Sequence, residues 1–350
     1  MEQGDRASCV RSVSTPVYRI LDANLDRARE GLRILEEWCR FGLNQAELTE
    51  KIKHWRQTLA QWHTPEMRAA RDTPGDLGTA LTHDQEASRT SLQQVIQANL
   101  CRVQEALRVL EEYGKLVSPE MGATFKQMRY QVYTLESQLQ LYIRRQQLQQ
   151  AQTYLVTSPQ ENMIDTVEAA LRGGLAMVQY REKTANDCDR WPIVQRLRQL
   201  CAQHDALFLV NDRVDLALAV NADGVHLGQQ DLPIAVARQL LGDMAIIGRS
   251  TTNPDEMERA IAEGADYIGV GPVYATPTKP DKAAAGLDYV RYAAAHATVP
   301  WFAIGGIDQG NLAQVQEAGA WRVAVVRAIM QAEQPTLATQ QLAAQLRSSI

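Results

Sequence analysis

The chain has 350 residues, of which 45% are hydrophobic and 22% are charged. This composition supplies enough apolar surface for a folded core, and no apolar run reaches the roughly 18–20 residues that a membrane span requires. The 36 Lys and Arg against 41 Asp and Glu leave a net charge of −5, so no chain-wide basic field favours nucleic acid or an anionic membrane. We therefore expect a globular protein that binds neither, with any anion site confined to a local cluster. Oligomeric state does not follow from these values.

The cysteines and the N-terminal residues indicate the compartment. No two cysteines stand in a C-x-x-C pair, so neither a disulfide framework nor a structural zinc site is indicated. Reduced thiols in the cytoplasm fit this pattern best. Residues 1–17 lack the apolar core of a signal peptide, and we expect them to form a disordered extension. The five cysteines are Cys9, Cys39, Cys101, Cys188 and Cys201.

A helical pattern covers residues 18–149. Apolar side chains recur three and four residues apart, and long Glu, Arg, Gln and Leu side chains favour helices. The Gln-rich stretch 138–152 keeps this spacing through Leu139 and Tyr142, which predicts a helix that leads into the second half. We therefore predict an all-α domain over residues 18–149.

The all-α domain contains an internal repeat. The segment ANLDRAREGLRILEE at 23–37 returns as ANLCRVQEALRVLEE at 98–112, with ten of the fifteen positions identical. A second helical pattern with a basic and aromatic patch follows each copy. The repeat predicts two helical hairpins packed with pseudo-two-fold symmetry.

Two polar residues fall inside the apolar arc of each copy. At about 100° per residue, Asn24 and Arg27 lie among the apolar side chains of the first copy, and Asn99 and Arg102 do so in the second. Burying an arginine is costly without partners, so these residues either pair across the pseudo-dyad or face an anionic ligand. The side chains expected to face away from the arc are Arg29, Arg33, Glu36 and Glu37.

The segment RDTPGDLGT at 71–79 separates the two copies. It is rich in turn-forming residues and contains two carboxylates, Asp72 and Asp76. The segment either binds a metal-bound nucleotide or caps the next predicted helix, at 86–99.

From residue 150 onwards the pattern changes. Short Val, Ile and Leu-rich runs alternate with amphipathic segments of helix length, which is typical of repeated βα units around a parallel sheet. Eight such units in about 200 residues predict a (β/α)₈ TIM barrel over residues 150–350, whose site lies at the carboxyl ends of the strands. The predicted strands are Tyr154–Thr157, Met177–Arg181, Leu207–Asp212, Gly224–Leu227, Ile246–Arg249, Tyr267–Gly271, Trp301–Ile304 and Arg322–Val326.

Carboxylates and cations follow several of these strands. Asp212 and Asp231 come from neighbouring strands, and Mg²⁺ typically takes one or two carboxylates together with water and phosphate oxygens. Asp231 equally fits the cap of the helix that starts at Leu232-Pro233. Arg181, Lys183 and Lys279 belong to the same rim, where they would neutralise a departing pyrophosphate.

A second anion site is predicted after the last two strands of the barrel. The Gly305-Gly306 turn and the loop after the eighth strand occupy the usual phosphate pocket of this fold, where backbone N–H groups hold a phosphate. The two predicted anion sites together imply two anionic substrates.

His226 lies between apolar neighbours in a strand, so we interpret it as a hydrogen-bonded structural residue.

The order of these motifs resembles the thiamine-phosphate synthase family over roughly 151–330. The matching strings are VQYREK, LVNDRVDLALAVNADGVHLGQQDLP, IIGRSTTN, ADYIGVGPVYATPTKPD, FAIGGI and VAVVRAI. The resemblance implies that hydroxymethylpyrimidine diphosphate is joined to thiazole phosphate, with release of pyrophosphate and no enzyme nucleophile. It assigns Mg²⁺ to Asp212 and Asp231. The residues that it implies at the pyrimidine diphosphate are Gln179, Arg181, Lys183, Asn211, Ser250 and Lys279, of which Arg181, Lys183, Ser250 and Lys279 would be catalytic. Tyr180 and Glu182, from the same VQYREK string, are further candidate substrate-binding residues.

The same resemblance implies a thiazole phosphate site lined by Thr276, Thr278, Gly306, Val326 and Arg327. Arg327 departs from the family pattern, in which serine is common, so either its guanidinium or the backbone contacts the phosphate there. An alternative is the related thiazole tautomerase group. The intact diphosphate motifs argue against it, because tautomerisation requires no diphosphate site.

The helical half resembles a hydroxymethylpyrimidine phosphate kinase family that occurs fused to such synthases. The strings that show this are ANLDRAREGLRILEE, RDTPGDLGT and ANLCRVQEALRVLEEYGKL. The resemblance implies ATP as a cosubstrate. The candidate site of this half consists of the polar residues of the apolar arc and the carboxylates of the 71–79 segment: Asn24, Arg27, Asp72, Asp76, Asn99 and Arg102. No P-loop is present in the sequence. The alternative is a non-catalytic helical module for dimerisation or for support of the barrel.

Overall fold

The computed structural model describes residues 13–77, 89, 92–276 and 283–347. The chain divides into two compact units, Met1–Gln140 and Leu141–Ile350. Helix α5 (Pro119–Gln150) continues through this division, which lies earlier in the chain than the predicted boundary at 149/150. The division lies earlier because the last turns of α5 pack against the barrel and belong to its unit. The predicted extension, residues 1–17, lies largely outside the described residues, and α1 begins within it, at Thr15.

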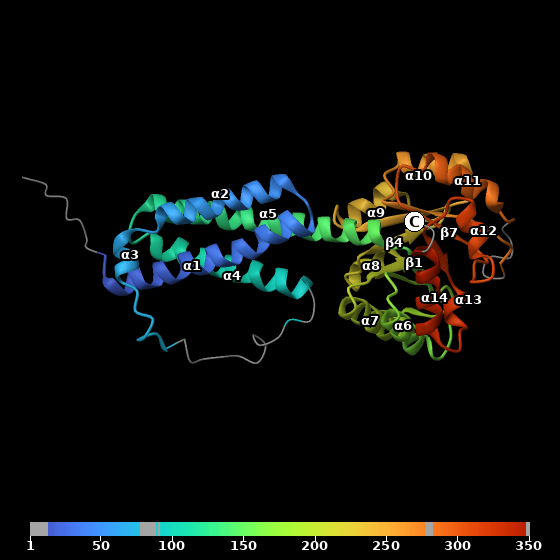
Figure 1. The fold of residues 1–350 in the computed structure, drawn as a ribbon, viewed down its shortest axis with the longest axis horizontal. Coiled ribbons are helices and arrows are strands. Elements are labelled where there is room, and N and C mark those ends of the chain that lie inside the picture. Colours follow the sequence, from blue (N-terminus) through green and yellow to red (C-terminus); the bar gives the residue numbers. More distant parts are fainter. Residues whose placement is uncertain (1–12, 78–88, 90–91, 277–282, 348–350) are drawn as a thin grey trace, which may run out of the picture. The chain divides into compact units, whose positions relative to one another are not determined.

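The first unit is all α (Figure 1). The two repeat copies lie within α1 and α4, and each is followed by a further helix that returns along it, α2 and α5. The elements are α1 (Thr15–Glu37), the π-helical turn η1 (Trp38–Gly42), α2 (Ala46–Trp62), α3 (Pro65–Ala69), α4 (Leu92–Gly114) and α5 (Pro119–Gln150).

Helices α1 and α4 approach each other closely at Gly31. A Cβ atom at this position would lie 2.6 Å from the Val103 Cγ2 and 3.2 Å from the carbonyl oxygen of Asn99. The apolar side chains on either side of this crossing, Leu32 and Leu107 among them, are fully buried. The missing side chain at Gly31 therefore sets how closely the two repeat copies pack.

A larger side chain at Gly31 is expected to destabilise the helical unit. Gly31→Leu forces the stiff, β-branched Val103 or the helix backbone to move, and overpacking of this kind costs about 1–3 kcal/mol. Calorimetry of the full-length chain should show a lowered unfolding temperature. Glu30→Leu, one residue away on the exposed face, should leave that temperature nearly unchanged, and an equal effect of the two changes would contradict the crossing described here.

The polar residues of the repeat are arranged differently from the prediction. Arg27 and Arg102 are exposed, so their assignment to the apolar arc was wrong. Asn24 and Asn99 are buried, as predicted, and each donates a 2.8 Å hydrogen bond to the carbonyl oxygen four residues earlier in its own helix. These amides are therefore satisfied locally, without a partner across the repeat.

Glu36, predicted to face away from the core, is buried instead, as is its counterpart Glu111. Each carboxylate meets an arginine from the following helix. The Glu36 Oε2 lies 2.5 Å from the Arg56 Nη1, and the Glu111 Oε2 lies 2.8 Å from the Arg129 Nη2. The internal repeat therefore places one buried ion pair in each hairpin.

The second unit contains eight parallel strands that form a closed barrel in sequence order, with helices around it (Figure 1). This confirms the predicted fold class. The strands are β1 (Thr153–Val156), β2 (Met177–Tyr180), β3 (Leu207–Asn211), β4 (Gly224–Leu227), β5 (Ile246–Thr251), β6 (Tyr267–Val270), β7 (Trp301–Ile304) and β8 (Val323–Val325). The helices are α6 (Met163–Arg172), α7 (Asp187–Gln203), α8 (Val214–Ala219), α9 (Ile234–Leu241), α10 (Pro254–Ala262), α11 (Gly286–His296), α12 (Leu312–Glu317), α13 (Arg327–Met330) and α14 (Pro335–Arg347).

Two apolar layers hold the barrel together. The outer layer packs between strands and helices, and the inner layer fills the barrel with Tyr154, Tyr267 and Phe302. At the amino ends of the strands, the last turns of α5 add Leu148 to the inner layer. Arg144 of this segment reaches the Asp223 carboxylate at 3.2 Å. One end of the barrel is thus filled, so access to its interior is from the carboxyl ends.

None of the helices within the described residues is long and apolar enough to cross a membrane.

Candidate active site

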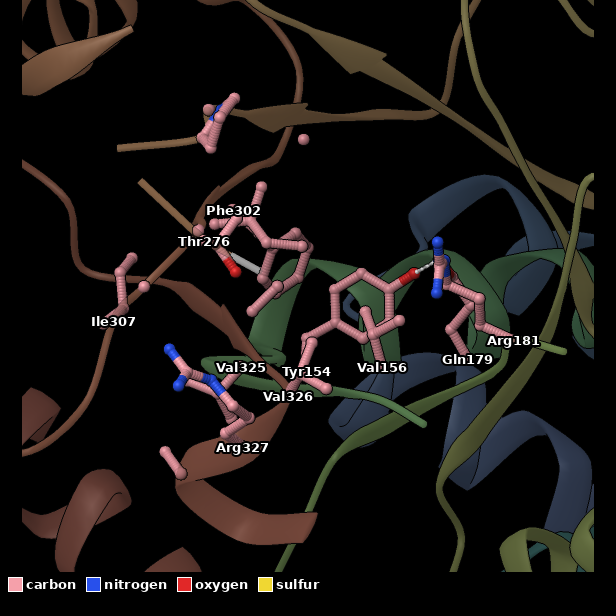
Figure 2. Close-up of a pocket in the computed structure, with 18 of the residues that line it drawn as sticks. Tyr154, Val156, Gln179, Arg181, Thr276, Phe302, Ile307, Val325, Val326 and Arg327 are labelled. Carbon is pink, nitrogen blue, oxygen red and sulfur yellow. Dashed lines mark hydrogen bonds between the residues drawn. The ribbon is translucent and has the colours of Figure 1, made fainter. Parts of the chain in front are cut away.

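A cavity of about 320 Å³ opens at the carboxyl ends of the strands (Figure 2). Apolar and aromatic side chains form its floor, and polar side chains from several strands surround them. The predicted site residues that line it are Gln179, Arg181, Asn211, Ser250, Thr276, Gly306, Val326 and Arg327. These residues are far apart in the sequence, and closure of the barrel brings them to one rim.

Strand β2 alternates its side chains between the cavity and the outer layer. Gln179 points into the barrel, where its amide donates a hydrogen bond to the Tyr154 hydroxyl. Arg181 follows it on the cavity side, and its backbone N–H donates to the Thr157 Oγ1 at 3.0 Å. Tyr180 packs in the outer layer, so the structure does not bring this predicted contact to the cavity.

Glu182 and Lys183 leave the strand and serve different contacts. The Glu182 carboxylate accepts from the backbone N–H groups of Thr184 and Ala185, at 2.6 and 3.1 Å. These bonds outweigh its partial desolvation and lower the pKa of Glu182. Lys183 extends to the Asp212 carboxylate, with its Nζ 3.1 Å from the Oδ2. Neither side chain lines the cavity, so Glu182 stabilises the loop and Lys183 neutralises an acidic residue.

Asp212 and Asp231 form an acidic pair beside the cavity. Desolvation and the neighbouring Asp231 carboxylate raise the pKa of Asp212, and the Lys183 ammonium opposes this shift. The Asp231 Oδ2 accepts from the Gly228 backbone N–H at 2.5 Å. Helix α9 begins at Ile234 with Pro233 at its cap, so the alternative prediction that Asp231 caps this helix was wrong. The fold therefore holds two carboxylates close together, and a bound cation would reduce the electrostatic repulsion between their charged forms.

The opposite side of the cavity is formed mainly by backbone. Gly305 and Gly306 have φ values of 108° and 67°, a left-handed conformation that side chains other than glycine rarely adopt. A Cβ atom on Gly306 would also lie 2.9 Å from the Tyr274 Cβ. Val326 and Arg327 line the cavity beside this turn, and Figure 2 shows them adjacent. The predicted contacts Thr278 and Lys279 lie outside the described residues.

Several cavity residues were missed in the sequence. Tyr154 and Phe302 form its floor. His226 lines its wall, and its two ring nitrogens are hydrogen-bonded to the Tyr267 hydroxyl and to the Ser250 Oγ. The interpretation of His226 as hydrogen-bonded is confirmed. The available signal was a polar residue at an inward position of a fully buried strand, shared by Tyr154, Gln179 and His226.

The candidate residues of the helical unit are not gathered in the same way. Asp72 accepts from the backbone N–H of Gly75 at 3.0 Å and lies 3.6 Å from the Arg19 guanidinium. Asp72 and Asp76 are exposed, helix α4 runs from Leu92, and the predicted helix start at residue 86 lies outside the described residues. Part of the intervening loop lies outside the described residues. Arg27 and Arg102 are exposed as well, so these candidate residues lie on the surface of the described part of the unit.

A buried cluster lies beside that loop and was not predicted. The Asp22 carboxylate of α1 is hydrogen-bonded to the His63 Nε2 at 2.6 Å and accepts a hydrogen bond from the Arg71 Nε at 2.7 Å. Burial opposes ionisation of Asp22, but the hydrogen bonds from Arg71 and His63 prevail and lower the pKa of Asp22. Asp26 also contacts the Arg71 guanidinium. The cluster connects the start of the loop to α1.

The fold and the cavity define a (β/α)₈ barrel enzyme with a site for small polar molecules at the carboxyl ends of the strands. A model described as thiamine monophosphate synthase matches residues 153–329, and a ThiD2 family model matches residues 19–138. The chain is 67% identical over 334 residues to a thiamine-phosphate synthase of Nostoc punctiforme, covering 95% of both chains. It is 68% identical to that of a Synechocystis species, covering 95% of this chain and 97% of the relative. The chain belongs to the thiamine-phosphate synthase family and is a transferase.

A solved structure agrees with this family over the barrel. The thiamine phosphate pyrophosphorylase of Pyrococcus furiosus is 37% identical and superposes with a TM-score of 0.54. The match covers 59% of this chain and 98% of the archaeal chain. The helical unit is therefore an addition to a barrel that the archaeal chain has without it.

Proposed function

We propose that the barrel joins hydroxymethylpyrimidine diphosphate to thiazole phosphate and releases pyrophosphate. The observation that supports this best is the sharing of one cavity by Arg181, Asn211 and Ser250 on one side and the Gly305-Gly306 turn on the other. The first group suits a diphosphate, and the backbone of the second suits a monophosphate. Two anionic substrates thus have places on opposite walls.

The chemistry assigned to the chain is stabilisation of the leaving group and positioning. When the C–O bond to the diphosphate breaks, the electron pair leaves with pyrophosphate, and the thiazole nitrogen forms the new C–N bond at the same carbon. Arg181 neutralises charge that develops on the departing oxygens, and Asn211 and Ser250 orient the diphosphate. This reaction requires no nucleophile from the protein.

We also propose that Mg²⁺ binds at Asp212 and Asp231. The donor set fits a hard cation, because both ligands are carboxylates and the pair is held close enough to raise the pKa of Asp212. The bound ion would supply charge neutralisation at the diphosphate. Lys183 already contacts Asp212, so its ammonium holds this carboxylate in place.

For the helical unit we propose phosphorylation of hydroxymethylpyrimidine phosphate by ATP, which would produce the diphosphate used by the barrel. The support is the ThiD2 family match over residues 19–138 and its fusion to the barrel in one chain. The alternative is a non-catalytic module, because the exposed Arg27 and Arg102 do not need an anionic ligand to compensate burial. We propose the cytoplasm as the compartment, because the four described cysteines are free thiols.

One experiment tests the synthase proposal and the kinase proposal together. The full-length protein with Mg²⁺ and thiazole phosphate receives either the pyrimidine diphosphate or the pyrimidine monophosphate with ATP, and thiamine phosphate is measured. We expect product in both reactions. Product from the diphosphate alone would overturn the kinase proposal and leave the helical unit as a structural module. Absence of product from both would overturn the synthase proposal and favour a tautomerase.

A further inference from the structure

A chain of hydrogen bonds crosses the interior of the barrel beneath the cavity. The Gln179 amide donates to the Tyr154 hydroxyl, which lies 2.8 Å from the Tyr267 hydroxyl. The Tyr267 hydroxyl lies 2.8 Å from the His226 Nδ1, and the His226 Nε2 lies 2.8 Å from the Ser250 Oγ. This hydrogen-bond chain thus connects Gln179 on β2 with Ser250 on β5, and both of these residues line the cavity.

One direction of the chain satisfies each of these buried hydroxyl groups. The Tyr154 oxygen accepts from the Gln179 amide, so its hydrogen finds an acceptor at Tyr267, and the Tyr267 hydrogen in turn finds one at the His226 Nδ1. A ring nitrogen that accepts is unprotonated, so His226 carries its hydrogen on Nε2 and donates it to Ser250. The Ser250 hydrogen is then turned away from the imidazole and towards the cavity.

The tyrosines are suited to this fixed direction. Burial raises the pKa of Tyr154 and that of Tyr267 well above the ordinary value, so both remain protonated donors. The Tyr267 ring packs edge-on against Tyr154 and Phe302, with centroids 5.9 and 5.7 Å apart. A Cβ atom at Gly248 would lie 2.1 Å from the Tyr267 Cζ, so only glycine on β5 leaves room for this ring.

The contact between His226 and Ser250 differs from a nucleophilic pair. In a Ser-His-Asp triad a carboxylate on Nδ1 stabilises the imidazolium that forms when the serine loses its proton. Here the Nδ1 partner is the hydroxyl of the protonated Tyr267, which offers no negative charge. The arrangement orients the Ser250 hydroxyl and does not activate it.

We infer that Tyr267 and His226 are positioning residues that aim the Ser250 hydroxyl as a hydrogen-bond donor at an oxygen of the diphosphate. The inference rests on the proposed function of the cavity. A pre-oriented donor strengthens its bond as negative charge develops on the leaving group, so the loss should appear in kcat more than in KM. Tyr154 and Gln179 complete the chain and determine its direction.

Three variants of the full-length protein test this inference, with thiamine phosphate formation as the readout. Tyr267→Phe removes the link to Nδ1 and keeps the ring, and we expect kcat to fall about tenfold while KM for the diphosphate changes less than about threefold. In His226→Asn the amide lies near the former Nδ1 and does not reach Ser250, so kcat should fall as much as in Tyr267→Phe. His226→Gln places its amide N–H near the former Nε2, so it should retain most of the activity by donating to Ser250.

Tyr289→Phe is the matched control. Its hydroxyl is buried and donates to the Thr251 Oγ1 at 2.6 Å, and its ring lies in the outer layer of the same barrel. Both tyrosine variants therefore remove one buried hydroxyl group, but only Tyr267→Phe interrupts the chain. Equal kcat values in the two variants would overturn the inference.

A double-variant cycle with Ser250→Ala separates positioning from general support. If Tyr267 acts through Ser250, then Tyr267→Phe in the Ser250→Ala background should lower kcat by less than about twofold. Independent tenfold losses that multiply would overturn the inference while leaving the synthase proposal intact. Failure of the unaltered protein to form thiamine phosphate would instead overturn the proposed function.

Discussion

Replacing Asp212 with asparagine is expected to lower kcat/KM for thiamine phosphate formation about 10²–10³-fold, because one of two carboxylates proposed to bind Mg²⁺ is lost. Asparagine has the same size and tolerates the positive φ of 60° at this position, so the backbone should remain unchanged. The measurement is a Mg²⁺ titration of steady-state turnover. It should show a higher Mg²⁺ requirement as well as a lower maximal rate.

Asp215→Asn provides the control for the lost charge. Asp215 also follows β3 and pairs with an arginine, Arg213, at 2.5 Å, but its side chain is 67% exposed and does not line the cavity. We expect its turnover and Mg²⁺ dependence to match those of the unaltered protein. If Asp212→Asn also retains full activity at limiting Mg²⁺, the metal assignment is wrong.

The largest expected effect on stability comes from Arg129→Met in the helical unit. Arg129 is buried and binds the Glu111 carboxylate through two nitrogens, at 2.9 and 2.8 Å. Removing it leaves Glu111, which is 3% exposed, with the half-exposed Arg108 as its remaining cationic partner among the described residues. Loss of one member of a buried ion pair typically costs about 3–5 kcal/mol. Hydrogen exchange of the slowest amides in α4 and α5 should show this loss.

The double variant Glu111→Leu with Arg129→Met distinguishes an unpaired charge from lost packing. Replacing both members by apolar side chains removes the uncompensated carboxylate, so much of the stability should return. Arg102→Met, in the same unit but exposed, should change the exchange rates little. If the double variant is as unstable as Arg129→Met, then packing by the arginine side chain is the dominant contribution.

The barrel was predictable because each of its features is local in the sequence. Each of the eight predicted strands overlaps an observed one, and Gly224–Leu227 and Trp301–Ile304 agree at both ends. Short β-branched runs separated by amphipathic segments define such units by themselves. The rim residues were found for a related reason, since the residue that follows a parallel strand must lie at the carboxyl end of the sheet.

The helical unit was less predictable because its polar residues depend on neighbours from other helices. Arg27 falls inside the apolar arc by angle alone but is exposed, and Glu36 falls outside it but is buried against Arg56. A helical wheel averages over one helix, whereas α1 is covered by α4 on one side and by α2 on another. The width of the buried face therefore follows from packing.

The sequence by itself determined the two-part organisation, the repeat, the barrel and most residues of its rim, because periodicity and strand ends are properties of the local chain. Only the tertiary structure decided which inward side chains meet. Tyr154, His226 and Tyr267 belong to three strands, and their hydroxyl and imidazole groups come within 2.8 Å only when the sheet closes. Hydrogen bonds require this proximity and direction, and no pattern along the chain specifies either.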